Sequence, residues 1–209
     1  MSAPSRPTRK EQQARTRAAL VRSATAAMAD KGLQAASIAE IAADAGFTKG
    51  AFYANFASKD ELLLAVLDET FDRAIGDIER AIRDHDDIDD QARDAGDAWL
   101  TQTGAEPTGG RLFLELMVHA VRDETFRAAF VERRRGLRDR VTEIYEARAA
   151  EMGLRAPFPL EDAARMTSVM AHGVALDRLV EPDGIDDAFF GTMLVTFFAG
   201  LQVGGSTGE

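Results

Sequence analysis

The 209-residue sequence contains no cysteine, which excludes disulfide bonds, thiolate metal sites and cysteine nucleophiles and fits a reducing compartment. Proline is also scarce, and none occurs between Pro7 and Pro107. Proline breaks helices, and no strand-like alternation of apolar and polar residues is present. The sequence therefore predicts an all-α protein.

Long apolar runs are missing as well. The most apolar segment, residues 188–203, is shorter than the ~20 residues of a membrane-spanning helix and includes Thr192 and Thr196. The first 16 residues are polar and basic, unlike a secretory signal. We therefore expect a cytoplasmic protein that has no membrane partner.

The formal charge of −10 is distributed unevenly along the chain. Residues 1–60 contain nine Lys or Arg and five Asp or Glu, a charge of +4, whereas residues 61–209 contain sixteen and thirty, a charge of −14. A basic head can hold one end of a protein on phosphates while the acidic body is repelled. The pattern favours an oriented contact with DNA, although a chance imbalance of surface charge would have the same composition.

The spacing of apolar residues predicts about nine helices. Ser37 with Glu40, and Ser58 with Glu61, have the spacing of capping boxes, which mark the starts of the second helix and of a long fourth helix. The expected helices span about residues 10–31, 37–45, 48–56, 58–83, 92–102, 112–121, 124–152, 160–180 and 186–203, with a solvated acidic connector at residues 84–90.

Residues 37–56 predict a helix-turn-helix, because a glycine-containing turn at residues 45–47 joins two short helices and Thr48 caps the second. In such a motif the second helix enters the major groove of DNA. Residues 37–63, SIAEIAADAGFTKGAFYANFASKDELL, closely resemble the DNA-binding region of the TetR (tetracycline-repressor) family. With the first helix the resemblance covers about residues 15–67, and the rest of the chain is similar in helix count and in its last two helices.

This resemblance implies a domain organisation and a function. It places a helix-turn-helix DNA-binding domain at residues 1–60 and a helical ligand-binding and dimerisation domain at residues 61–209. Members of the family are homodimers that bind palindromic operators in double-stranded DNA and usually leave DNA when a small molecule binds. We therefore expect a repressor that is released by an apolar or amphipathic effector. A regulator without a ligand, or a non-catalytic interaction protein of the same fold, remains the alternative.

The residues expected to contact DNA lie at the starts of the second, third and fourth helices and along the third. Thr48 and Lys49 occupy the positive end of the third helix, and Gly50 lets its backbone approach closely. The resemblance adds Tyr53 and Asn55, although the family more often has histidine at the latter position. The full set is Ser37, Thr48, Lys49, Gly50, Tyr53, Asn55 and Lys59.

Two further features border this motif. Phe52 and Phe56 are expected to pack inward and hold the third helix against the first two. Arg6, Arg9 and Lys10 could form a basic arm that reaches an adjacent groove, but we expect this terminal segment to be disordered.

Signals of an enzyme are weak. Residues 204–208, GGSTG, match the nucleophile-elbow pattern, but that pattern requires a preceding strand and a later histidine. His85, His119 and His172 lack the i+4 partner of a helical zinc site. We therefore expect no catalysis, no metal and no cofactor, and the sequence leaves the roles of His119 and His172 open.

The last helix carries apolar residues over more than one stripe, which indicates burial on two sides. By family resemblance, the last two helices form a four-helix bundle with those of a second subunit. Burial inside one subunit would produce the same pattern. The candidate interface residues are Phe190, Met193, Leu194, Phe197, Phe198 and Leu201.

The candidate ligand-binding residues are aromatic or methionine side chains on helices that the family arranges around a pocket. Such a lining would suit a flat or lipid-like apolar molecule. The same residues at helical spacing could equally form plain core. The set is Trp99, Phe113, Met117, Tyr145, Met166 and Met170.

Overall fold

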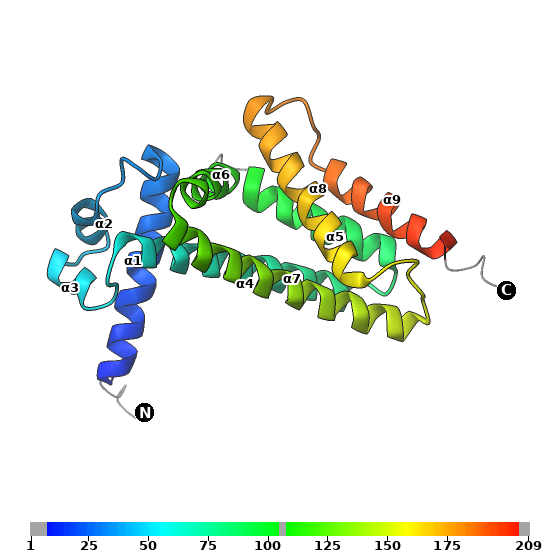
Figure 1. Cartoon of the computed structure of the whole chain (residues 1–209), viewed down its shortest axis with the longest axis horizontal. Coiled ribbons are helices and arrows are strands. Elements are labelled where there is room, and N and C mark those ends of the chain that lie inside the picture. The colour runs from blue at the N-terminus through cyan, green and yellow to red at the C-terminus, as the bar shows by residue number, and fades with distance from the viewer. Residues whose placement is uncertain (1–7, 105–107, 205–209) are drawn as a thin grey trace, which may run out of the picture. The chain divides into compact units, whose positions relative to one another are not determined.

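The computed structural model describes residues 8–104 and 108–204. Within these ranges the chain forms nine helices and no strand, which confirms the all-α prediction (Figure 1). None of these helices is long and apolar enough to cross a membrane. In chain order they are α1 (Arg9–Lys31), α2 (Ile38–Asp44), α3 (Lys49–Tyr53), α4 (Lys59–Asp84), α5 (Ile88–Gly104), α6 (Thr108–Arg122), α7 (Glu124–Met152), α8 (Leu160–Val180) and α9 (Phe189–Gly204).

Helix α3 is shorter than the sequence predicted, because it ends at Tyr53 rather than at Phe56. The side chain of Asn55 explains the difference. Its Nδ2 donates to the carbonyl oxygen of Ala51 at 2.8 Å, while its backbone N–H donates to the carbonyl of Phe52 at 2.8 Å. A side chain thus takes the acceptor that the next helical backbone bond would use.

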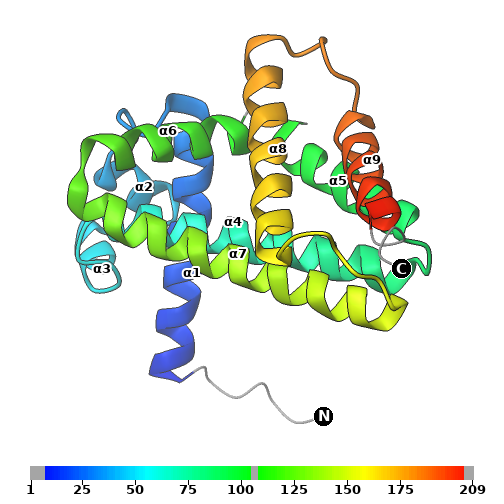
Figure 2. The ribbon, with the colours of Figure 1, turned by 45° about the vertical axis from the view of Figure 1, so that its right-hand side comes forward.

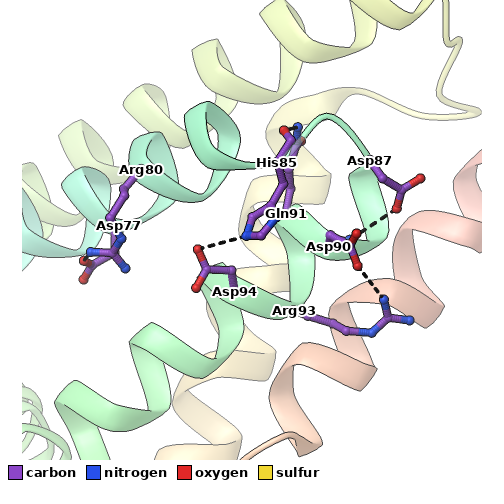
Figure 3. A network of polar contacts seen from close by, with 8 residues as sticks. All are labelled: Asp77, Arg80, His85, Asp87, Asp90, Gln91, Arg93 and Asp94. Carbon is purple, nitrogen blue, oxygen red and sulfur yellow. Dashed lines mark hydrogen bonds and ion pairs between the residues drawn. The ribbon is translucent and has the colours of Figure 1, made fainter.

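Helix α5 begins at Ile88 rather than at Ala92, so part of the expected acidic connector is helical. Asp87 is the cause, since its Oδ1 accepts a hydrogen bond from the backbone N–H of Asp89 at 2.8 Å. The same oxygen accepts from the backbone N–H of Asp90 at 3.3 Å (Figure 3). Carboxylates are favoured at this end of a helix. His85 in the shortened connector lies 3.5 Å from the carboxylate of Asp94 (Figure 3).

The start of α1 corrects a third expectation. Arg9 and Lys10 form the first helical turn instead of a disordered arm, because Thr8 Oγ1 accepts from the backbone N–H of Glu11 at 3.2 Å and caps the helix. Arg6 lies outside the described residues, as do residues 205–208 of the GGSTG segment.

The chain divides into two compact units, Met1–Asp68 and Glu69–Glu209, and the division falls within α4. In the first unit, α1, α2, α3 and the start of α4 enclose a core of apolar side chains. Phe52 is 0% exposed and Phe56 is 1% exposed, which confirms that both point inward. The other central members of this core are Leu20, Ala24, Met28, Ile41, Leu62 and Leu63.

In the second unit, α9 lies along α5 (Figure 2). The two helices approach so closely at Gly96 and Gly191 that a Cβ atom added to Gly96 would lie 2.7 Å from the Cα atom of Gly191. Glycine is therefore required at this crossing by packing. Around it, Leu100, Phe190 and Leu194 form a buried apolar cluster with α8 residues.

Candidate nucleic-acid interface

A reciprocal side-chain cap fixes the start of α2. Ser37 Oγ accepts from the backbone N–H of Glu40 at 3.2 Å, and Glu40 Oε2 accepts from the backbone N–H of Ser37 at 3.1 Å. These hydrogen bonds, together with the positive charge of Lys31, hold the pKa of the Glu40 carboxyl below its usual value. The predicted capping box is confirmed.

The turn between α2 and α3 depends on one glycine. Gly46 has a φ of +79°, a left-handed conformation that glycine adopts without strain. The next N–H, from Phe47, donates to the Ala42 carbonyl at 2.8 Å and closes the end of α2. Thr48 then caps α3, since its Oγ1 accepts from the Ala51 backbone N–H at 3.2 Å.

The solvent-facing side of α3 carries four of the predicted DNA contacts. Thr48, Lys49, Gly50 and Tyr53 are all exposed, and the Tyr53 side chain is 51% exposed. Lys49 Nζ lies 6.0 Å from the centre of the Tyr53 ring, so the ammonium and the phenol share one surface. The buried Phe52 anchors the opposite side of the helix.

Gly50 is not required by the packing of the first unit. A Cβ atom added there would meet only Thr48 Oγ1, at 3.6 Å, which is an ordinary van der Waals distance. The lack of a side chain therefore leaves the backbone of the first turn of α3 accessible from outside. This is the geometry expected where a second molecule approaches a helix N-terminus closely.

The remaining predicted contacts are placed differently. Ser37 is exposed, whereas Asn55 and Lys59 are partly buried. The Asn55 amide nitrogen is engaged by Ala51, and its Oδ1 is buried without a hydrogen-bond partner among the described residues. Lys59 Nζ donates to the carbonyl oxygen of Leu33 at 2.6 Å, and burial lowers the pKa of this ammonium. Both side chains thus hold the protein's own backbone.

Arg17 on α1 is a positioning residue that sequence reasoning missed. Its guanidinium carbon lies 4.1 Å from the centre of the Phe56 ring, and Nη1 donates to the Asn55 carbonyl at 3.1 Å. The same nitrogen is 3.8 Å from a carboxylate oxygen of Glu61. Arg17 therefore fastens the segment between α3 and α4 to α1, and no local sequence pattern reveals a contact across 38 residues.

The six candidate ligand residues lie in several places of the second unit. Trp99 packs on Phe190 with ring centres 5.1 Å apart, and Met117 is partly buried on α6. Tyr145 OH lies 3.0 Å from Thr167 Oγ1, and burial raises the pKa of the phenol to about 12. Of the six, Met166 and Met170 border an open apolar hollow of about 410 Å³, together with Arg165, Val169 and Phe197.

Phe113 marks an aromatic centre in the second unit. Its ring stacks on the imidazole of His172, with ring centres 4.4 Å apart and an angle of 9° between the planes. Burial, and then the charge of Arg134, lowers the pKa of His172 to about 4, so this imidazole is neutral at pH 7. His119 packs against Phe126 at 4.5 Å. Among the described residues no three His, Asp or Glu side chains are placed to share a metal ion.

The candidate interface residues of α9 face different surroundings. Phe190 and Leu194 are buried against α5 within their own subunit, and Met193 and Phe198 pack against the same cluster. Phe197 borders the open hollow, and Leu201 is partly buried.

A second apolar surface lies on α8, a helix that is expected from the sequence to take part in dimerisation, although only Met166 of this surface is named there, as a candidate ligand residue. It consists of four side chains that follow helical spacing and are 44%, 61%, 47% and 80% exposed, respectively. We call these residues the α8 stripe: Met166, Val169, Leu176 and Val180. Exposed apolar stripes of this kind mark interaction surfaces.

Comparison with protein families matches both parts of the chain. Residues 20–66 match the model of bacterial regulatory proteins of the tetR family, and residues 88–202 match the C-terminal model of BetI-type transcriptional repressors. A curated relative, the HTH-type transcriptional activator FasR of Mycolicibacterium smegmatis, is 34% identical over 99 residues. That match spans 47% of this chain and 45% of the relative, so less than half of either protein is compared.

Solved structures share the fold. A putative TetR-family regulator from Rhodococcus sp. has a TM-score of 0.77 and 17% identity, with 90% of this chain and 99% of that chain covered. FadR from Bacillus subtilis, solved in complex with stearoyl-CoA, has a TM-score of 0.69 and 14% identity, with 92% and 99% covered.

Proposed function

Because the chain belongs to the TetR family of bacterial regulatory proteins, we propose that it acts as a homodimer that binds a palindromic operator in double-stranded DNA. The observation that carries this proposal is the exposed face of α3, where Thr48, Lys49, Gly50 and Tyr53 lie together. Helix N-termini attract phosphates, and a cap, an ammonium and a phenol supply donors for phosphates or base edges. We also propose that the protein acts in the cytoplasm, where its operator would lie.

A binding selection tests the DNA contact. Random duplexes that the full chain retains are sequenced, and affinity for the enriched operator is measured by fluorescence anisotropy. Lys49→Ala should weaken binding, whereas Arg155→Ala, which removes the same charge from an exposed site in the second unit, should not. Failure to enrich any sequence would favour the interaction-protein alternative.

Dimerisation would use the α8 stripe together with exposed parts of α9. An apolar surface gains from being covered, by roughly 25 cal/mol per Å². Leu176→Asp puts a carboxylate in this surface, where burial without a partner is costly. Leu176 is 47% exposed in the subunit, so the fold should tolerate the change. Sedimentation of this variant is expected to show monomers. A dimer that persists in the variant would show that the interface does not include α8.

For the second unit, we propose a sensor of a small apolar or amphipathic effector that releases the dimer from DNA. The BetI-type match over residues 88–202 supports a repressor. The FasR relative, an activator, supports the opposite sign. Transcription from an operator-linked promoter in vitro, with and without the protein, separates the two. FadR was solved with stearoyl-CoA, which makes long-chain acyl-CoA a reasonable first candidate effector.

A further inference from the structure

Arg134 on α7 has a half-buried guanidinium with no carboxylate beside it in the described part of the chain. The guanidinium carbon lies over the Phe113 ring, 5.9 Å from the ring centre. Burial lowers the pKa of Arg134, and the nearby positive charges of Arg138 and Arg165 lower it further. Residues 61–209 contain thirty Asp and Glu, so a shortage of acidic residues in this part of the sequence does not explain why none lies beside Arg134.

The two neighbouring arginines share a single acid. Arg138 Nε and Arg165 Nη2 lie 3.4 and 3.1 Å from the same oxygen, Oε1 of Glu161. Arg138 Nε is buried and makes no hydrogen bond. Among the described residues, one exposed carboxylate thus serves two of the three guanidinium groups, and the third, that of Arg134, is half-buried without one. A half-buried charge without a partner is destabilising, and an anion bound beside it would remove this cost.

Aromatic and apolar groups lie next to two members of this arginine cluster, by which we mean Arg134, Arg138 and Arg165. Arg134 lies over the Phe113 ring, which stacks on the neutral imidazole of His172. Arg165 borders the open apolar hollow of about 410 Å³ that the α8 methionines line. The two helices that carry the cluster, α7 and α8, pack against each other (Figure 2).

We propose that the arginine cluster binds the oxyanion head of an amphiphilic small molecule, a carboxylate or a phosphate ester, whose apolar part lies against Phe113. This inference rests on the proposed effector-sensing function and specifies the chemical class of the effector. Guanidinium groups suit such heads because they donate two parallel hydrogen bonds to planar or tetrahedral oxyanions.

Three probes of equal chain length test the proposal on the full-length dimer. Decanoate and decyl phosphate carry the head group, decanol lacks the charge, and binding is followed by calorimetry. Arg134→Gln removes the unpaired charge, whereas Arg135→Gln removes a charge from the exposed neighbouring position. We expect at least one anionic probe to bind more tightly than decanol, and Arg134→Gln to weaken it about 10- to 100-fold. Arg135→Gln should leave it unchanged.

A second readout separates ligand binding from a structural role. If Arg134 binds an anionic ligand and has no acidic partner in the ligand-free protein, Arg134→Gln removes an uncompensated charge. The melting temperature of the ligand-free variant should then equal or exceed that of the wild type. The proposal is overturned if neither anion binds better than decanol, or if the two glutamine variants behave alike. It is also overturned if Arg134→Gln dissociates the ligand-free dimer, which would assign the guanidinium to an acid of the partner subunit. Operator affinity, measured in parallel, shows whether the DNA-binding function stands when this inference fails.

Discussion

The exposed backbone at Gly50 permits a substitution whose effects on stability and on DNA binding should have opposite signs. Gly50→Ala adds one methyl group to the first turn of α3. The added Cβ meets only Thr48 Oγ1 at 3.6 Å, and the backbone at Gly50 has no positive φ. Nothing inside the first unit must move to accept the methyl group. The substitution should therefore stabilise the folded state, because alanine lowers the conformational entropy of the unfolded chain.

The expected magnitudes follow from these contacts. Replacing a helical glycine with alanine stabilises a protein by roughly 0.5–1 kcal/mol, and a first-turn position lies at the lower end. A methyl group forced into a closely packed contact costs about 1–3 kcal/mol. If the DNA backbone or a base edge packs against Gly50, operator affinity should fall roughly 5- to 150-fold while the melting temperature stays equal or rises.

Gly136→Ala is the matched control. Gly136 lies within α7, and a Cβ atom added there would meet nothing within 4 Å. This variant should gain similar stability and keep full operator affinity, as measured by thermal unfolding and by fluorescence anisotropy. If Gly50→Ala binds the operator as tightly as the wild type, the backbone of α3 does not approach DNA closely and the proposed docking of this helix is wrong.

Two further substitutions test the internal packing of each unit, Gly96→Ala in the second and Lys59→Met in the first. Gly96→Ala should destabilise the protein by about 1–3 kcal/mol, because the new Cβ would lie 2.7 Å from Gly191. Gly136→Ala, with open space around it, is again the control, and equal melting temperatures of the two variants would contradict the close crossing. Lys59→Met should lower the free energy of unfolding by about 1–2 kcal/mol, since the Leu33 carbonyl loses a charged donor. A decrease of about 0.9 in the log–log salt slope of operator binding would show that Lys59 also neutralises a phosphate.

Local chemistry made the first unit readable from sequence. The capping residues Ser37 and Thr48 and the turn glycine Gly46 act over three or four residues, so their spacing alone predicts where α2 begins and ends and where α3 begins. The end of α3 was placed too late, because the hydrogen bond from the Asn55 side chain to the Ala51 carbonyl is not visible in the spacing. Phe52 and Phe56 could be assigned to the core because helical periodicity separates their side of the segment from the exposed residues.

The second unit was harder because its helices carry apolar residues on several sides, and periodicity does not say which neighbour covers which side. Phe190 and Leu194 look like interface residues in sequence, but α5 covers them at the glycine crossing. Met166, expected to line a pocket, borders the apolar hollow and also belongs to the exposed α8 stripe, a surface that periodicity alone does not show. The unpaired state of Arg134 is likewise invisible in sequence, because it depends on which acids fold next to it.

The contacts within the first unit restrict how an effector could act. A helix of five residues is not stable by itself, so α3 keeps its shape only through the buried Phe52 and the caps at its ends. Arg17 and Lys59 add bonds from α1 and α4 to the backbone that borders this motif, including the carbonyls of Asn55 and Leu33. A change in the shape of α3 would break several of these contacts together. A movement of the first unit as a rigid body would break none of these contacts. We therefore expect regulation to change the spacing of two intact recognition helices in the dimer, with an effector favouring the spacing that does not fit one turn of DNA.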